Sequence, residues 1–221
     1  NMVGVAAGLA TCGKIPFAAS FAMFSAGRAF EQVSKSVGYP KLNVKIVGSH
    51  AGISVGEDGA THQCCEDIAL MRTIPGMVIL NPCDHYEMQA AVRAAVEHKG
   101  PCYIRLGRLA VESINNNDDY KFELGKGITL REGTDITVVA TGLMVQEAVK
   151  AADALKEEGI SVEVINIHTI KPLDEELVIA SAKKTGRVIT VEEHNIIGGL
   201  GEVVSYALSE HCPTPVTRTG V

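Results

Sequence analysis

The chain has 221 residues, of which 46% are hydrophobic and 21% charged, and 26 acidic against 20 basic residues give a formal net charge of −6 at pH 7. This composition is typical of a globular protein with one large or two small domains, and it excludes disordered and collagen-like chains. No apolar run approaches the roughly 20 residues of a membrane-spanning helix. The acidic balance argues against a nucleic-acid-binding surface, so small molecules and protein partners are the expected ligands.

Six cysteines are scattered along the chain without the C-x-x-C spacing of a zinc site. A chain of this length does not depend on disulfides for stability, so we expect reduced thiols and a cytoplasmic protein. The first residue is Asn1, and no basic segment followed by an apolar stretch marks a signal peptide. The sequence is therefore expected to start within a longer structural element.

Apolar, β-branched runs alternate with helical patterns along the chain. Strands are predicted at residues 15–19, 44–47, 77–80, 103–106, 136–140, 162–167 and 188–191. Helices, with apolar residues three or four apart, are predicted at residues 31–37, 66–71, 86–97, 145–157, 175–184 and 202–209. Almost wholly apolar strands that alternate with helices are typical of a parallel sheet covered on both faces. The predicted fold class is therefore α/β.

One break divides this pattern. A polar run from Asn115 to Asp119 is followed by a stretch up to Thr134 without a clear period, and residues 115–134 are predicted to form a linker. Two domains would then span residues 1–114 and 135–221, both within the usual size range. Both are expected to contain mostly parallel sheets, and the second sheet to accommodate an antiparallel strand.

The most informative stretch is Ser49–Gln63, SHAGISVGEDGATHQ, which follows a predicted strand and precedes a predicted helix. In an open α/β sheet, ligands bind at the loops that leave the carboxyl ends of strands. The glycines allow the backbone to approach a ligand closely, and His50, Asp58 and His62 can exchange or share protons near neutral pH. The residue types fit equally well a solvent-facing loop whose histidines cap the next helix.

Phenylalanines gather where one predicted strand gives way to a helix, at Phe17, Phe21 and Phe24. At helical spacing they would share one face, and such an aromatic stripe usually packs in a core. The alternative is that they stack on a flat heteroaromatic ring held at the carboxyl end of the strand.

Several motifs follow one another along nearly the whole chain: the FxxF of Phe21 and Phe24, GEDGATHQ with His50 upstream, IRLGR at residues 104–108, IKPLDEE at 170–176 and EEHNIIGGLG at 192–201. In these motifs the chain resembles the transketolase family. GEDGATHQ is long and specific, whereas the GGLG turn occurs in several thiamine diphosphate families. The resemblance covers a pyrimidine-binding domain without its start and most of a C-terminal domain.

The resemblance implies thiamine diphosphate as cofactor and the reversible transfer of a two-carbon ketol unit from a ketose phosphate to an aldose phosphate. Phe21 and Phe24 would sandwich the aminopyrimidine ring of the cofactor. A third aromatic residue that animal- and yeast-type transketolases place three residues later is Gly27 in this chain. This departure implies a looser pyrimidine pocket or a substitute from elsewhere.

The same resemblance assigns roles to four polar residues. His62 would lie beside the reacting carbon of the cofactor and transfer protons, and His50 would bind hydroxyl and carbonyl oxygens of the donor. Asp58 would accept a hydrogen bond from the 2-hydroxyl of the acceptor aldose. Arg108, expected to end the fourth strand, would contact the sugar phosphate, with Arg105 as its rival on the opposite face of the strand.

Two elements of a complete transketolase site are not found in this sequence. The activating glutamate of the family lies just upstream of Asn1, and no GDG is followed 25–30 residues later by the asparagine that holds Mg²⁺ and the diphosphate. We therefore expect these groups from an N-terminal, diphosphate-binding subunit in an α2β2 assembly. The competing interpretation is that the sequence is a fragment of one long transketolase chain.

Rival functions are distinguished by the same loop. 1-Deoxyxylulose-5-phosphate synthase shares the DG-x-TH core, but Glu57 and the spacing from His50 to Asp58 are transketolase-like. The β subunits of 2-oxo acid dehydrogenases lack DG-x-TH. A non-catalytic subunit that kept the fold only for assembly would not need titratable groups such as His62 and Arg108 around a glycine loop.

Overall fold

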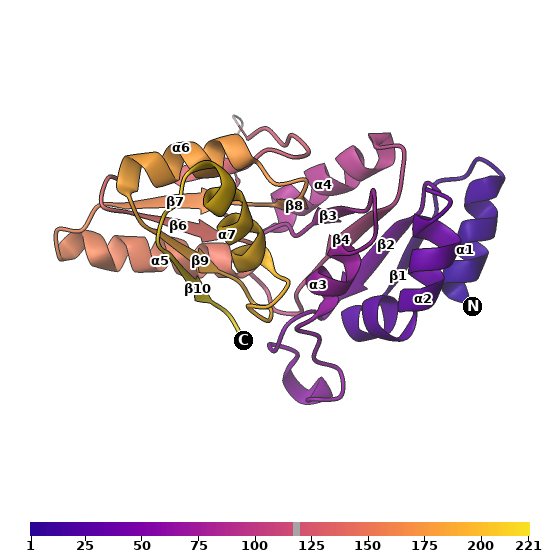
Figure 1. The fold of residues 1–221 in the computed structure, drawn as a ribbon. Coiled ribbons are helices and arrows are strands. Elements are labelled where there is room, and N and C mark those ends of the chain that lie inside the picture. The colour runs from indigo at the N-terminus through magenta and orange to yellow at the C-terminus, as the bar shows by residue number, and fades with distance from the viewer. Residues whose placement is uncertain (117–119) are drawn as a thin grey trace.

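Two five-stranded sheets form the fold (Figure 1). The structure is a computed structural model that describes residues 1–116 and 120–221, so residues 117–119 of the predicted polar run lie outside the described residues. Both sheets are mostly parallel and are flanked by helices. The predicted α/β class and two-domain architecture are therefore confirmed.

The first sheet has the strand order β1-β2-β4-β3-β8. Strands β2 and β4 lie inside it and are almost fully buried, which fits the apolar residues at the centre of each strand. The first four strands pair in parallel, and β8 joins β3 antiparallel. The strands are β1 (Phe17–Phe21), β2 (Lys45–Ser49), β3 (Val78–Leu80), β4 (Cys102–Arg105) and β8 (Thr169–Lys171).

Helices cover this sheet, and one of them, α4, begins at a side-chain cap. The Asp84 carboxylate accepts a hydrogen bond from the Glu87 backbone N–H at 2.9 Å and so starts α4. Between β1 and β2, residues 23–38 form one helical segment in which α2 (Phe30–Gln32) joins two π-helical stretches. The remaining helical elements are α1 (Met2–Thr11), a 3₁₀ turn (Gly56–Asp58), α3 (Asp67–Arg72) and α4 (His85–Glu97).

The second sheet has the order β10-β9-β6-β7-β5, with β5 antiparallel to β7. Its helix α6 starts at Asp174, whose side chain accepts from the Leu177 N–H at 3.2 Å, and ends at the left-handed Gly186. The strands are β5 (Ile128–Arg131), β6 (Ile136–Ala140), β7 (Val162–Asn166), β9 (Val188–Val191) and β10 (Val216–Thr219). The helices are α5 (Met144–Glu157), α6 (Glu175–Thr185) and α7 (Leu200–His211).

The second domain donates β8 to the sheet of the first, and in Figure 1 this strand forms the edge of that sheet on the side of the second domain. The Lys171 ammonium at its end donates to the Arg72 and Ile74 carbonyls at 2.7 and 2.8 Å. One buried apolar cluster also contains side chains of both domains, among them Ile79 and Ile170. The domains are therefore held in a fixed relation by a shared sheet and a shared core.

A buried carboxylate adds a further contact between the domains. Glu87 of α4 accepts hydrogen bonds from the Cys83 N–H at 2.7 Å, the Tyr120 hydroxyl at 2.9 Å and the Asn166 amide at 2.8 Å. Burial raises the pKa of Glu87, and these donors partly offset the rise. The carboxylate thus connects α4 to β7 and to the segment between the domains.

Six elements of the described residues lie outside the predicted set: α1, the π-helical stretch Met23–Arg28, the 3₁₀ turn Gly56–Asp58, β5, β8 and β10. Strand β5 falls within the predicted linker at residues 115–134. Its four residues alternate apolar and polar, but the run is too short for a clear period, and all four are only half-buried at a sheet edge. Strand β8 has only three residues, too few for a periodic signal.

Two details near the site differ from the sequence prediction. Strand β1 runs to Phe21 and includes Phe17, so Phe17, Phe21 and Phe24 do not share a helix face. Strand β4 ends at Arg105, and Arg108 lies in the irregular segment that follows it. The last register pair of β4 with β2 is Gly48–Arg105; after a final hydrogen bond from the Leu106 N–H to the Gly48 carbonyl at 2.8 Å, the chain leaves the ladder.

Candidate active site

All six residues predicted for the site come together at the carboxyl ends of β1, β2 and β4. Phe21 ends β1, His50 follows β2 directly, and Arg108 follows β4. Asp58 and His62 lie on residues 50–66, here called the site loop, which leaves β2 and extends away from the sheet to the bottom of Figure 1. The parallel sheet brings these loops to one edge, as the sequence predicted.

An aromatic wall forms one side of the cluster. The rings of Phe21 and Phe24 are nearly parallel, 9° apart, with centroids 6.1 Å from each other. The His50 ring stacks on Phe21 at 3.9 Å, and the His62 ring meets Phe21 and Phe24 edge-on at 5.7 and 5.4 Å. The guanidinium of Arg28 lies 4.9 Å from the Phe24 centroid, at the distance of a cation–π contact.

Charged groups form the other side of the residue cluster. One Asp58 carboxylate oxygen lies 4.0 Å from His50 Nε2 and 3.4 Å from Arg108 Nε. Arg108 also donates to Glu57 at 2.6 Å, a partner that the sequence did not predict. A hydrogen bond from its own backbone N–H and the nearby Arg108 charge lower the pKa of Glu57. Because the Arg108 side chain remains 29% exposed, an anionic ligand can still reach its guanidinium.

The local backbone sets the two histidines in place. His50 adopts the left-handed conformation with φ 55°, which is uncommon for a residue other than glycine. Its Nδ1 lies 3.1 Å from the Ser49 hydroxyl, and His62 Nδ1 lies 2.9 Å from the Thr61 hydroxyl. Because Nδ1 of each ring is engaged with a neighbouring hydroxyl, Nε2 is the nitrogen left to exchange a proton with a bound molecule.

Arg105, the rival candidate for the phosphate contact, is not available to a ligand. Its side chain is only 4% exposed and donates from Nε to the buried Asp67 carboxylate at 2.8 Å. Burial tends to lower the pKa of Arg105, but the neighbouring Asp67 carboxylate raises it above its usual value, so the guanidinium stays charged. Arg108 is therefore the arginine that faces the candidate site.

His194, beside the GGLG turn, is fully buried and also has a structural role. Its Nε2 accepts from the Ala69 N–H at 3.4 Å, in the first turn of α3, and Nδ1 lies 2.7 Å from the Asn195 carbonyl. Burial and the Arg105 charge lower the pKa of His194, which suits a neutral ring that donates at one nitrogen and accepts at the other.

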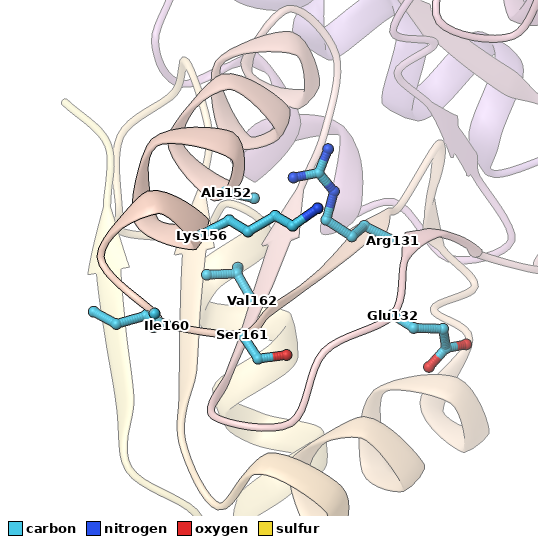
Figure 2. Close-up of a pocket in the computed structure, with 8 residues that line it drawn as sticks. Arg131, Glu132, Ala152, Lys156, Ile160, Ser161 and Val162 are labelled. Atoms are coloured by element: carbon cyan, nitrogen blue, oxygen red, sulfur yellow. The ribbon is translucent and has the colours of Figure 1, made fainter.

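A cavity in the second domain shares no residue with the candidate site. Figure 2 shows this cavity of about 460 Å³, lined by Arg131, Lys156 of α5 and Val162 of β7. Arg131 already pairs with Asp153 at 2.6 Å. Within residues 1–116 and 120–221, no three His, Cys, Asp or Glu side chains are arranged to hold a metal ion. The same residues include no helix both long and apolar enough to cross a membrane.

Comparisons with known proteins identify the family. Residues 1–113 match the family described as transketolase, pyrimidine binding domain, and residues 125–221 match transketolase, C-terminal domain. The chain belongs to the transketolase family. It is therefore part of a thiamine diphosphate-dependent family of transferases, as the sequence motifs predicted.

Relatives of this transketolase-family chain include subunits of split enzymes. It is 53% identical to a putative transketolase C-terminal section of Methanocaldococcus jannaschii, over 96% of the chain and 66% of the relative. It is 50% identical to a 6-deoxy-6-sulfo-D-fructose transketolase subunit of a Clostridium species, over 100% of the chain and 68% of the relative. The chain thus spans about two thirds of the length of these relatives.

A solved structure supports the same relationship. The structure described as a split gene transketolase, inactive beta4 tetramer, superposes with a TM-score of 0.92 at 51% identity, covering 99% of this chain and 71% of the other. The structural likeness extends over both domains, so the relation is not confined to the pyrimidine-binding half.

Proposed function

We propose that this chain supplies the pyrimidine-binding side of a two-component transketolase, which transfers a two-carbon ketol unit reversibly from a ketose phosphate to an aldose phosphate. The observation that carries the proposal is the joint placement of an aromatic wall, two half-exposed histidines and the Asp58–Arg108 pair on one sheet edge. A purely structural subunit has no need for titratable groups gathered around partly exposed rings.

The aromatic wall fits the pyrimidine ring of thiamine diphosphate. Phe21 and Phe24 are both partly exposed, and offset or edge contacts with a flat ring add about 1 kcal/mol per ring pair to the burial of apolar area. When bound, the cofactor would supply the reactive ring that accepts and releases the two-carbon unit. We propose that Phe21 and Phe24 hold the pyrimidine, and that Mg²⁺ and the diphosphate are held by the partner.

The histidines would handle protons and sugar oxygens. Because His62 lies edge-on to both phenylalanines, its Nε2 can reach a group held against them, and we assign it the proton transfers of ketol addition and release. His50 faces the same wall and lies 4.0 Å from Asp58, so it can donate to a donor hydroxyl or carbonyl oxygen. Asp58 would accept a hydrogen bond from the acceptor 2-hydroxyl.

Arg108 would bind the anionic end of the sugar. Its guanidinium offers a planar set of donors that matches a phosphate, and Glu57 and Asp58 orient it. A sulfonated ketose is a second candidate donor, because a relative 50% identical to this chain is named a 6-deoxy-6-sulfo-D-fructose transketolase subunit. A sulfonate presents a similar set of acceptor oxygens, so Arg108 can serve either substrate class.

The assembly we propose is a cytoplasmic α2β2 enzyme with an N-terminal, diphosphate-binding transketolase subunit as partner. Two 45–50% identical relatives are named as subunits, one of them of an apulose-4-phosphate transketolase of Phocaeicola vulgatus. This naming supports a division of the enzyme between two chains.

The proposal is tested on the complex with the partner subunit, thiamine diphosphate and Mg²⁺. Ketol transfer is measured with phosphorylated and sulfonated ketose donors and, separately, with pyruvate as the sole donor. We expect His62→Ala to lower kcat about 10²- to 10⁴-fold, as loss of a general acid–base group does. The control is His211→Ala on α7, a half-exposed imidazole remote from the cluster, which should leave kcat unchanged.

Three results would contradict the proposal. Full turnover of the His62→Ala complex would remove the role of that imidazole. Efficient use of pyruvate as donor would favour a deoxyxylulose-phosphate-synthase-like reaction. Assembly without any transfer to an aldose phosphate would favour a non-catalytic subunit.

A further inference from the structure

We propose that Glu193 of the C-terminal domain is a positioning residue that anchors the site loop, so that this domain helps to build the active site. Glu193 follows β9 and lies far from the loop in sequence, yet its carboxylate contacts the loop backbone directly. The kinetic part of this inference rests on the proposed function, whereas the structural part does not.

The contact consists of two hydrogen bonds to one oxygen. Glu193 Oε1 accepts from the Ile53 N–H at 2.8 Å and from the Ser54 N–H at 2.7 Å. Two consecutive backbone donors that converge on a carboxylate are among the stronger hydrogen bonds in proteins. The carboxylate is well shielded, because Glu193 is only 8% exposed.

The loop sequence is shaped for this approach. Gly52 has φ 87°, and a Cβ at this position would lie 2.4 Å from the Glu193 carboxyl carbon. Only glycine allows both the backbone conformation and the close contact. Gly52 also forms a two-way backbone bridge with Cys64, at 2.7 and 3.2 Å, which closes the base of the loop.

Glu193 itself is fixed from the first domain. Its backbone carbonyl accepts from Arg105 Nη2 at 2.8 Å, and Arg105 is held at the end of β4 by the buried Asp67. Two residues further on, the Asn195 N–H donates to the Cys65 carbonyl at 2.8 Å. The segment 193–195 therefore holds the site loop near both of its ends.

What lies between these anchor points is the reactive part of the loop. Asp58 and His62 stand on this stretch, whose only regular element is the 3₁₀ turn Gly56–Asp58. A loop with few internal hydrogen bonds opens easily unless its ends are fixed. The hydrogen bonds of the Glu193 carboxylate go to backbone amides and not to the His50 or His62 ring. Glu193 therefore acts indirectly, by fixing the loop that positions Asp58 and His62.

Three substitutions separate geometry from charge. Glu193→Gln keeps an acceptor oxygen at the same reach without the charge, whereas Glu193→Asp keeps the charge and withdraws the oxygen by one methylene. Glu193→Ala removes both. Anchoring by hydrogen bonds predicts that the Gln variant stays closest to the wild type and that the Asp and Ala variants are impaired. The matched control is Glu132→Ala, an exposed carboxylate that pairs with Lys184 in the same domain.

The first measurement is amide hydrogen exchange on the chain in complex with its partner. In Glu193→Ala and Glu193→Asp, protection of the Ile53 and Ser54 amides should fall about tenfold or more, since one tenfold step equals about 1.4 kcal/mol, the net worth of one such bond. Glu132→Ala should leave these amides unchanged. Unchanged protection in folded Glu193→Ala and Glu193→Asp would overturn the proposal.

The second measurement is ketol transfer by the same complexes. We expect kcat to fall at least tenfold in Glu193→Asp and Glu193→Ala and to stay close to the wild-type value in Glu193→Gln. The urea unfolding midpoints of Glu193→Gln and Glu193→Asp should be equal, which separates the change in kcat from global stability. A kcat that follows global stability, or an Asp variant as active as the wild type, would overturn the positioning role. If the wild-type complex transfers no ketol unit, the proposed function fails, and the exchange data still decide whether Glu193 anchors the loop.

Discussion

The buried Asp67–Arg105 pair at the domain junction gives the sharpest stability prediction. Asp67 is 0% and Arg105 4% exposed, and the Asp67 carboxylate accepts from Arg105 Nε and from the Tyr103 hydroxyl, each at 2.8 Å. Asp67→Ala would leave the buried Arg105 guanidinium without its carboxylate partner, with only the Glu193 carbonyl as acceptor, and the Tyr103 hydroxyl without an acceptor. Breaking a buried ion pair from one side costs about 3–5 kcal/mol.

This loss is a large part of the total stability of a typical protein, about 5–15 kcal/mol. For a chain of this length it corresponds to a fall of roughly 6–20 °C in the unfolding temperature, at about 2–4 °C per kcal/mol. The assay is urea unfolding of the isolated chain, followed by circular dichroism, with the change read from the midpoint at constant m-value.

Two companion variants make the prediction specific. Glu112→Ala breaks an exposed pair with Lys150, whose atoms lie 3.0 Å apart, and should leave the midpoint unchanged. The double variant Asp67→Leu/Arg105→Met removes both charges and should recover most of the loss, because no buried charge is left without a partner. A loss below about 1 kcal/mol in Asp67→Ala would refute the reasoning from burial.

Three further predictions follow from named contacts. Burial lowers the pKa of His168 to about 4, below the value of about 6.5 expected in the unfolded chain. Between pH 7 and pH 5 the unfolded state therefore binds more protons than the folded state, and the free energy of unfolding falls by about 2 kcal/mol as the pH is lowered across this range. Urea titrations at both pH values should show this extra loss in the wild type and not in His168→Gln. Gly52→Ala should destabilise the chain more than Gly159→Ala, because both glycines have positive φ but only Gly52 is crowded, and equal midpoints would contradict this. Phe24→Ala should weaken thiamine diphosphate binding by the complex about tenfold or more, as seen by calorimetry, whereas unchanged affinity would remove Phe24 from the pyrimidine pocket.

Much of the site could be predicted because its signal is local. His50, Asp58 and His62 lie on one glycine-rich loop directly after a buried strand, and parallel topology places that loop beside the end of β1. The motif resemblance then singled out Phe21 and Arg108. What alternation could not predict was the end of β4 at Arg105, because the end of a strand depends on its pairing partner.

Other features arise only when distant segments meet. Strand β8 joins the first sheet from the second domain, and its three residues carry no periodic signal. Glu57 becomes the partner of Arg108 across 51 positions of sequence, and Glu193 reaches Ile53 across 140. Neither pairing follows from the chemistry of the residues alone, since the chain contains 26 acidic residues that could have taken either place.

The sequence by itself determined the α/β class, the two domains and the loop that carries the titratable groups, because strand and helix periods and the glycine-rich turn are properties of neighbouring residues. The tertiary structure decided which arginine faces the candidate site, which is buried in the interior, and which carboxylate contacts the backbone of the site loop. These outcomes depend on burial and on contacts between remote segments, which exist only once both domains have packed around their shared sheet.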